Sequence, residues 1–289
     1  MVRPVVVAVD GSDESLCAAE WAAREAVRRA APLRIVSAPG LLPRMRGNQA
    51  PVATVANALR GIAARALADA VDRVNEVAAG VLVDTDLIDG PPAAAVRDSG
   101  TGALLLVVGA RGAGGFAALV LGSVSRYAAA HAPCPVVVVH EETRAVHREI
   151  VVGVRDPDAA DAALKFAFEE AALRASDLIV LHATSWSPAP GAAPHEDAAR
   201  EEKAPAAAAD RHLENVLDKW RRKFPDVMVT PDVARGHPAH LLASLSTRAD
   251  MVIIGRRDTA GTPGCGTVRH SLLGHAHGPV VVVPSISPE

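Results

Sequence analysis

Short apolar runs alternate with longer amphipathic or Ala-rich stretches along the first half of the chain. The runs begin at Val5, Leu33, Val81, Leu104 and Val136, and turn residues separate them from their neighbours. Apolar runs of roughly four to eight residues between turns are typical of buried strands, and the stretches between them have the length of helices. Strands that alternate with helices predict a parallel α/β sheet with right-handed crossovers.

The pattern assigns five strands and four helices to this half. The expected strands are Pro4–Val9, Leu33–Ala38, Val81–Ile88, Leu104–Val108 and Val136–Val139. The expected helices follow Ser12, cover Thr54–Ala79, run from Gly90-Pro91-Pro92 to about Asp98, and cover Ser123–His131. Ser12 or Asp13 can cap the first helix, because both side chains accept hydrogen bonds from free N–H groups of a first turn.

The same pattern then repeats. The segment that starts at Val5 aligns without a gap with the one that starts at Ile150, so that Asp10 faces Arg155 and Ala26 faces Ala171. Later segments repeat in the same order: Leu178–His182, Glu196–Lys223, Val227–Val233, Asp250–Gly255 and Val280–Val283. A repeat of this length indicates a duplicated domain. We expect domains at residues 1–141 and 149–289, with the charged linker Glu141–Arg148 between them.

Composition narrows the class of protein. The formal net charge of −3 argues against a nucleic-acid binder that works by charge. No apolar run reaches the ~20 residues that span a bilayer, and we expect a cytosolic protein. The three cysteines, Cys17, Cys134 and Cys265, are far apart and odd in number, which favours thiols over a disulfide or a metal site.

A glycine motif follows the strand at Leu104–Val108. It reads Gly109-x2-Gly112-x9-Gly122-Ser123, and a helix is expected to begin at its end. Glycine lets the backbone approach an anion, and the free N–H groups of a first helical turn point at it together with the helix dipole. The motif therefore predicts a phosphate site, although a flexible strand exit is the simpler alternative.

These features resemble the universal stress protein family, as two tandem copies over nearly the whole chain. The resemblance rests on the first strand VVVAVDGS, on S-x-x-A-x-x-W-A at Ser15–Ala22 and on the glycine motif. It implies two Rossmann-like domains of the adenine nucleotide alpha hydrolase-like type. Each would have a five-stranded parallel sheet of order 3-2-1-4-5 with helices on both faces, and ATP, possibly with Mg²⁺, would bind at the carboxyl ends of strands one and four.

The resemblance also implies nucleotide contacts in the first copy. Asp10 would lie near the adenine, and the pocket and phosphate contacts would come from Ala38, Val108, Gly109, Gly112, Gly122, Ser123, Val124 and Ser125. From Gly122 onward the backbone would supply N–H groups, and the two serines would supply hydroxyls. For Asp10 the alternative is a turn or a helix cap, since Asp before Gly-Ser is a common turn.

The second copy departs from this motif. Arg155 replaces the acid, and Gly255 and Gly266 are 11 residues apart, against 13 for Gly109 and Gly122. Asp258 would repel a phosphate, and the two serines of the motif are replaced by Thr267 and Arg269. We expect this copy to bind ATP poorly or not at all. The alternative is that Arg256, Arg257 and Arg269 form a different anion site.

The remaining motifs suggest no catalytic or metal centre. His131 and His275 recur at equivalent places and are expected at helix ends, where an imidazolium is favourable. No Walker, nucleophile-elbow or H-E-x-x-H motif is present. Fast phosphoryl transfer needs a positioned base and metal ligands as well as a phosphate cradle, so we expect a binding protein and not an enzyme.

The sequence thus predicts a cytosolic ATP-binding stress-response regulator that acts on a protein partner the sequence does not identify. The alternative is a structural or interaction module whose nucleotide site is vestigial. A homodimer could form through the apolar edge strands Val136–Val139 or Val280–Val283, because exposed strand edges pair readily.

Overall fold

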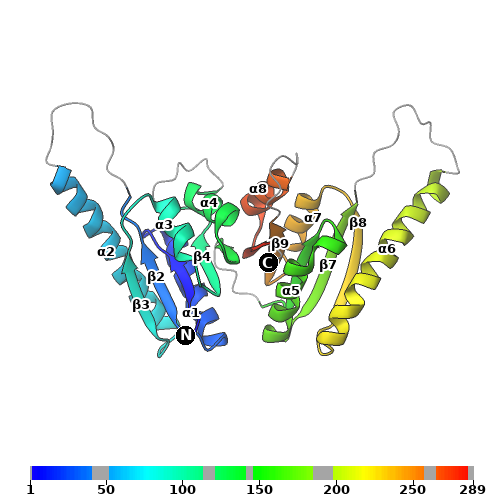
Figure 1. Cartoon of the computed structure of the whole chain (residues 1–289), viewed down its shortest axis with the longest axis horizontal. Helices are drawn as coiled ribbons and strands as arrows, with labels where there is room; N and C mark the ends of the chain where they lie inside the picture. Colours follow the sequence, from blue (N-terminus) through cyan, green and yellow to red (C-terminus); the bar gives the residue numbers. More distant parts are fainter. Residues whose placement is uncertain are drawn as a thin grey trace. The chain divides into compact units, whose positions relative to one another are not determined.

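The structure is a computed structural model that describes residues 2–40, 52–112, 121–140, 146–184, 198–256 and 265–285. The chain divides into two compact units, Met1–Glu142 and Thr143–Glu289. Each unit is a parallel α/β sheet with its own core, and Figure 1 shows the elements of both.

The first unit follows the predicted alternation of strands and helices. Its elements are β1 (Val5–Ala8), α1 (Asp13–Arg28), β2 (Leu33–Ser37), α2 (Val52–Val77), β3 (Val83–Leu87), α3 (Pro92–Ser99), β4 (Leu105–Gly109), α4 (Ser123–His131) and β5 (Val136–Val139). All neighbouring strands are parallel, in the order β3-β2-β1-β4-β5. The order 3-2-1-4-5 is therefore confirmed for this copy.

The second unit repeats the arrangement. Its elements are β6 (Glu149–Val154), the short 3₁₀ helix η1 (Pro157–Ala159), α5 (Asp161–Arg174), β7 (Asp177–Thr184), α6 (Ala198–Lys223), β8 (Val229–Arg235), α7 (Pro238–Leu245), β9 (Met251–Arg256), α8 (Cys265–His275) and β10 (Val280–Pro284). The strands follow the order β8-β7-β6-β9-β10 and are parallel. This is the same 3-2-1-4-5 order.

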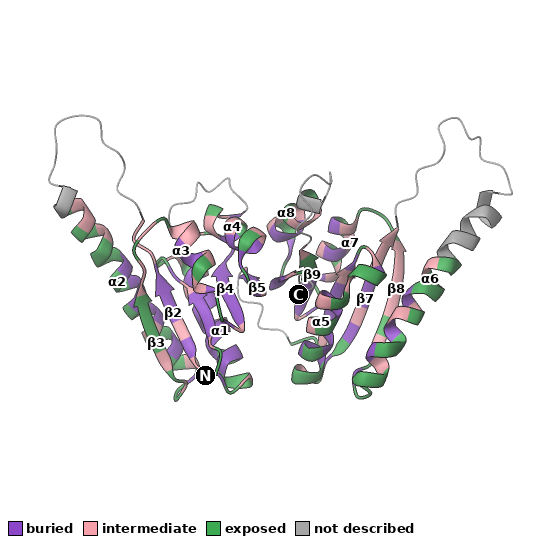
Figure 2. Ribbon diagram, in the orientation of Figure 1, coloured by how far each residue is buried: buried purple, intermediate pink, exposed green. Residues whose placement is uncertain are grey.

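Helices cover both faces of each sheet. The second and third strands are added on one side of the first strand, and the fourth and fifth strands are added on its other side. In the first unit α1 packs against α2, and α3 packs against α4. Right-handed crossovers place the first pair on one face and the second pair on the other. The central strands are buried accordingly, as Figure 2 shows: Val5, Val6 and Val7 have no exposed surface. Such continuous burial explains why these strands are runs of valine and leucine.

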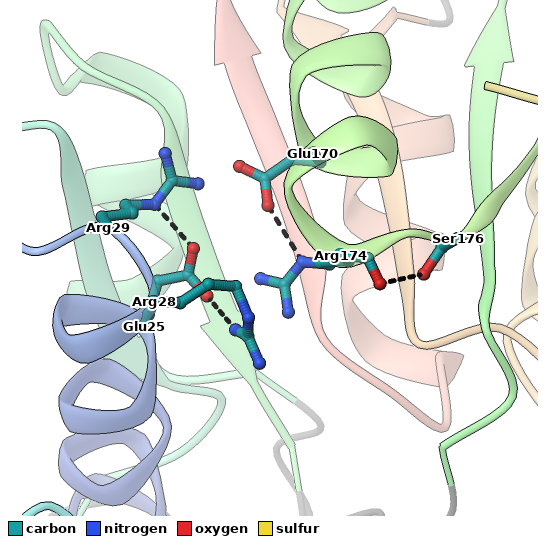
Figure 3. Close-up of polar contacts among 6 residues, drawn as sticks. All are labelled: Glu25, Arg28, Arg29, Glu170, Arg174 and Ser176. Carbon is teal, nitrogen blue, oxygen red and sulfur yellow. Dashed lines mark hydrogen bonds and ion pairs between the residues drawn. The ribbon is translucent and has the colours of Figure 1, made fainter. Parts of the chain in front are cut away.

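The end of the first helix is built alike in the two units (Figure 3). In the first unit the buried carboxylate of Glu25 accepts hydrogen bonds from Arg28 and Arg29, each at 2.6 Å. In the second unit the buried carboxylate of Glu170 accepts one from Arg174 at 3.0 Å. A buried carboxylate without such partners would be strongly unfavourable, so the arginines compensate the buried charge at both helix ends.

Candidate functional site

The switch point of the first sheet lies between β1 and β4. Val5 pairs with Leu105 and Ala8 pairs with Val108, so Asp10 and Ala110 follow together at the carboxyl ends of the two strands. From this point β1 leads toward β2 and β3, whereas β4 leads toward β5. Loops diverge at such a point and leave a crevice, which is where open α/β sheets bind ligands.

Asp10 is held at this switch point by a turn at the start of α1. Its Oδ1 accepts hydrogen bonds from the Ser12 N–H at 3.1 Å and from the Ser12 hydroxyl at 2.6 Å. Ser12, and not Asp10, caps α1, since its side chain accepts a hydrogen bond from the Ser15 N–H at 3.3 Å. The helix-cap alternative for Asp10 is therefore wrong, while the turn is present.

Gly112 lies against the other oxygen of the same carboxylate. A Cβ atom at this position would collide with Asp10 Oδ2. Two of the predicted site residues, far apart in the chain, are thus in direct contact at the switch point. Because Gly112 has no side chain, the carboxylate can lie against the backbone of the glycine motif.

Gly109 has a packing role that the sequence did not reveal. A Cβ atom here would lie 2.8 Å from the carbonyl carbon and oxygen of Glu14 and 3.0 Å from the nitrogen of Ser15. The first turn of α1 therefore packs directly on the backbone at the end of β4. Glycine is needed at this position for close approach of the protein's own backbone, independently of any ligand.

The start of α4 closes back on the end of β4. The Gly122 N–H donates to the Ala110 carbonyl at 2.8 Å, and the buried Ser125 hydroxyl donates to the Gly109 carbonyl at 2.6 Å. These two donors are used inside the protein. Among the described residues, the N–H groups of Ser123, Val124 and Ser125 precede the first backbone hydrogen bond of α4, from Arg126 to Gly122, so they can donate to a ligand together with the exposed Ser123 hydroxyl.

The other predicted pocket residues lie on neighbouring strands. Ala38 follows the end of β2 and is half-buried, and Val108 in β4 is buried. Ser37 was not among the predicted site residues; its hydroxyl donates to the Val9 carbonyl at 2.8 Å and ties the ends of β2 and β1 together. The ion pair between Arg111 and Glu14, at 2.8 Å, was not predicted either.

The second unit differs at several of these points. Its first long helix starts only at Asp161, after η1, and has no side-chain cap. Gly255 is exposed, and a Cβ atom there would meet Ala163 at an ordinary 3.6 Å. Arg155 and Arg256 occupy the places of Asp10 and Ala110. Arg257 and Asp258 lie outside the described residues, so their predicted effects stay predictions.

The histidines at the helix ends behave as expected. Nδ1 of His131 donates to the Tyr127 carbonyl at 2.9 Å, and Nδ1 of His275 donates to the Ser271 carbonyl at 2.8 Å. Within the described ranges, no three His, Cys, Asp or Glu residues are grouped so that they could hold a metal ion. None of the described helices is long and apolar enough to cross a membrane.

Comparison with known proteins agrees with the fold. The sequence profile of the universal stress protein family matches residues 1–140 and 147–284. Universal stress protein Rv2623 of Mycobacterium tuberculosis is 30% identical over 298 residues, covering 96% of this chain and 95% of that protein. A universal stress protein of Mycolicibacterium smegmatis is 32% identical over 296 residues, or 96% of each chain.

A solved structure shows the same architecture. The universal stress protein from Archaeoglobus fulgidus DSM 4304 matches with a TM-score of 0.72 at 16% identity, over 99% of this chain and 97% of that one. At this level of identity the likeness concerns the fold alone. The two profile matches and the mycobacterial relatives show that the chain belongs to the universal stress protein family.

Proposed function

We propose that the first unit binds an adenine nucleotide, ATP in the first place, and that the bound state regulates a protein partner. The observation that carries the proposal is the meeting of Asp10 and Gly112 at the switch point where α4 also begins. The Asp10 carboxylate would contact the nucleoside, and the Ser123 and Val124 N–H groups would bind phosphate with the helix dipole. The thiols of Cys17 and Cys134 suit the reducing cytosol.

We propose binding without fast hydrolysis. Two acidic side chains at this end of the sheet, Asp10 and Glu14, each have a partner in the protein, Ser12 for the first and Arg111 for the second. A general base must reach the attacking water, and phosphoryl transfer also needs ligands for Mg²⁺. Any turnover would therefore be slow compared with dissociation of the nucleotide.

The test is calorimetric titration of the full chain with ATP and Mg²⁺. Gly122→Val should abolish binding, because the added side chain would stand at the entry to α4, where the Ala110 carbonyl is already 3.4 Å from a Cβ position. Gly266→Val is the matched control at the equivalent position of the second copy and should leave binding unchanged. Equal ATP affinity of Gly122→Val and the wild type would refute the proposed site.

A second function, an interaction module with a vestigial nucleotide site, is supported by the second unit. That unit keeps all five strands although its glycine spacing differs, so the fold does not require the site. Thermal unfolding separates the functions, because a ligand that binds the folded state must raise its stability. A melting temperature unchanged by ATP would favour the interaction module.

A further inference from the structure

The edge strands β3 and β8 differ in how much of their backbone can still form hydrogen bonds. Within the described residues, β3 pairs with β2 alone and β8 pairs with β7 alone, so each strand has one open side. The residues of β3 are exposed or half-buried, and Figure 2 shows the centre of the strand as exposed. An open strand edge presents N–H and C=O groups with which another extended chain can pair.

The register of the first unit shows which groups of β3 face outward. The Leu33 N–H donates to the Leu82 carbonyl at 2.8 Å, just before β3 begins. In a parallel ladder the bonds to one neighbour come from alternate residues of a strand, so the even-numbered residues of β3 bond to β2. The residues whose N–H and C=O groups point to the open side are therefore Val83, Thr85 and Leu87.

Proline closes the same edge in the second unit. The Leu178 N–H donates to the Met228 carbonyl at 2.8 Å, which is the same contact at the equivalent place. The even-numbered residues of β8 therefore bond to β7, and Pro231 lies at an outward position. Proline has no N–H to donate, and its ring occupies the place of the donor. Its counterpart in the first unit is Thr85, which is exposed and keeps its N–H.

The charges beside the open edge of β3 are mainly negative. Asp84 and Asp86 are exposed and lie on the same face of the strand, because side chains two residues apart share a face. Arg34 of β2 is 3.4 Å from Asp84, and these two side chains are 44% and 69% exposed. Among the described residues, Asp86 has no ion-pair partner. Two carboxylates thus stand beside one guanidinium, and this face of the edge is net negative.

These charges distinguish a second copy of the chain from a different partner. If the β3 strands of two copies paired antiparallel around Thr85, Asp84 of each copy would face Asp86 of the other, and like charges directly opposite are destabilising. A strand with lysine or arginine at alternate positions would instead place cations beside the two carboxylates. Apolar residues at the positions between them would lie beside the half-buried Val83 and Leu87 on the other face.

We propose that β3 is a docking edge for the protein partner, and that the partner supplies an extended segment in which basic and apolar residues alternate. This segment would add to the first sheet as a further strand. Its main chain would pair with the three outward-facing residues of β3, and its cations would neutralise Asp84 and Asp86. The inference rests on the proposed function only in taking a protein partner to exist, and it requires no bound nucleotide.

The test is fluorescence anisotropy of a labelled peptide of alternating lysine and valine, titrated with the full chain. The wild type should bind it, and Thr85→Pro should raise the Kd about fivefold or more, because the edge loses one N–H donor. Thr85→Ala is the matched control: it keeps the N–H and should change the Kd less than about twofold, as for other surface substitutions. A peptide of alternating glutamate and valine should bind at least about tenfold more weakly, since it places like charges together.

Two further measurements keep the proposal open to refutation. Hydrogen exchange should show that the lysine peptide protects the N–H groups of β3 that face outward, and this holds even if Thr85→Pro does not fold. Asp84→Asn with Asp86→Asn keeps the backbone and should raise the Kd about threefold or more, as expected for two exposed ion pairs. No binding to the wild type, equal Kd values for Thr85→Pro and Thr85→Ala, or protection only outside β3 would overturn the proposal.

The outcome can be separated from that of the nucleotide site. Gly122→Val should bind the lysine peptide as tightly as the wild type does. A wild type that binds the peptide but no ATP would refute the nucleotide site and support the docking edge, whereas one that binds ATP but no peptide would do the reverse. A dimer that dissociates on Thr85→Pro, measured by sedimentation, would assign the edge to a second copy and overturn the proposal.

Discussion

At the carboxyl edge of its sheet, the first unit has Asp10 against Gly112, whereas in the second unit Arg155 follows β6 and Arg256 ends β9. Strand order, crossovers and the buried glutamate at the end of the first helix are the same in both. The helix start differs: α1 is capped by Ser12 and packs its first turn on Gly109, whereas η1 precedes α5 and Gly255 is exposed. The core sets the fold in both copies, so the charge at the carboxyl edge can change without loss of the fold.

The largest effect on stability is expected at two equivalent glycines, Gly109 at the end of β4 and Gly255 one residue before the end of β9. Gly109→Ala should destabilise the protein by about 1–3 kcal/mol, because the new Cβ would overlap the backbone of Glu14, which cannot move without shifting α1. Gly255→Ala should be neutral or stabilise by about 0.4–1 kcal/mol, since its Cβ fits and the unfolded chain loses freedom. Urea unfolding of both variants measures the difference, and equal values would mean that the two helix starts pack alike.

A separation of binding from stability is expected at Gly112. Gly112→Ala displaces the Asp10 carboxylate, an exposed group at the end of a side chain, so the free energy of unfolding should change by less than about 0.5 kcal/mol. The affinity for ATP should nevertheless fall about tenfold or more, as when one charged hydrogen bond is lost. Asp10→Asn is the control and should lose a similar part of the affinity. Normal ATP affinity in the Gly112→Ala variant would remove Asp10 from the site.

The smallest effect is expected at the ion pair between Arg111 and Glu14. The two side chains are 44% and 23% exposed, and exposed pairs contribute about 0.2–1 kcal/mol. Arg111→Gln should lower stability within that range and change the ATP affinity less than about threefold, because Glu14 holds the guanidinium against α1. A much larger loss of affinity, measured by calorimetry, would show that Arg111 turns to the phosphates when the nucleotide binds.

The sequence was sufficient to predict the helices and strands and their order along the chain. α4 and β5 have the predicted bounds, because Gly122-Ser123 and the valine run Val136–Val139 mark them locally. The roles of individual site residues depended on packing between distant segments. No local pattern shows that Glu14 lies over Gly109, or that the Ser125 hydroxyl is used by the Gly109 carbonyl, since both follow from where α1 and α4 rest on β4.

The central claim is that the first unit has a nucleotide site and the second unit does not. The most direct measurement is the number of ATP molecules bound per chain at saturation, by equilibrium dialysis of the wild type, Gly122→Val and Gly266→Val. The account predicts one tightly bound ATP in the wild type, one in Gly266→Val and none in Gly122→Val. Two equivalent ATP molecules in the wild type, or one in each variant, would contradict it.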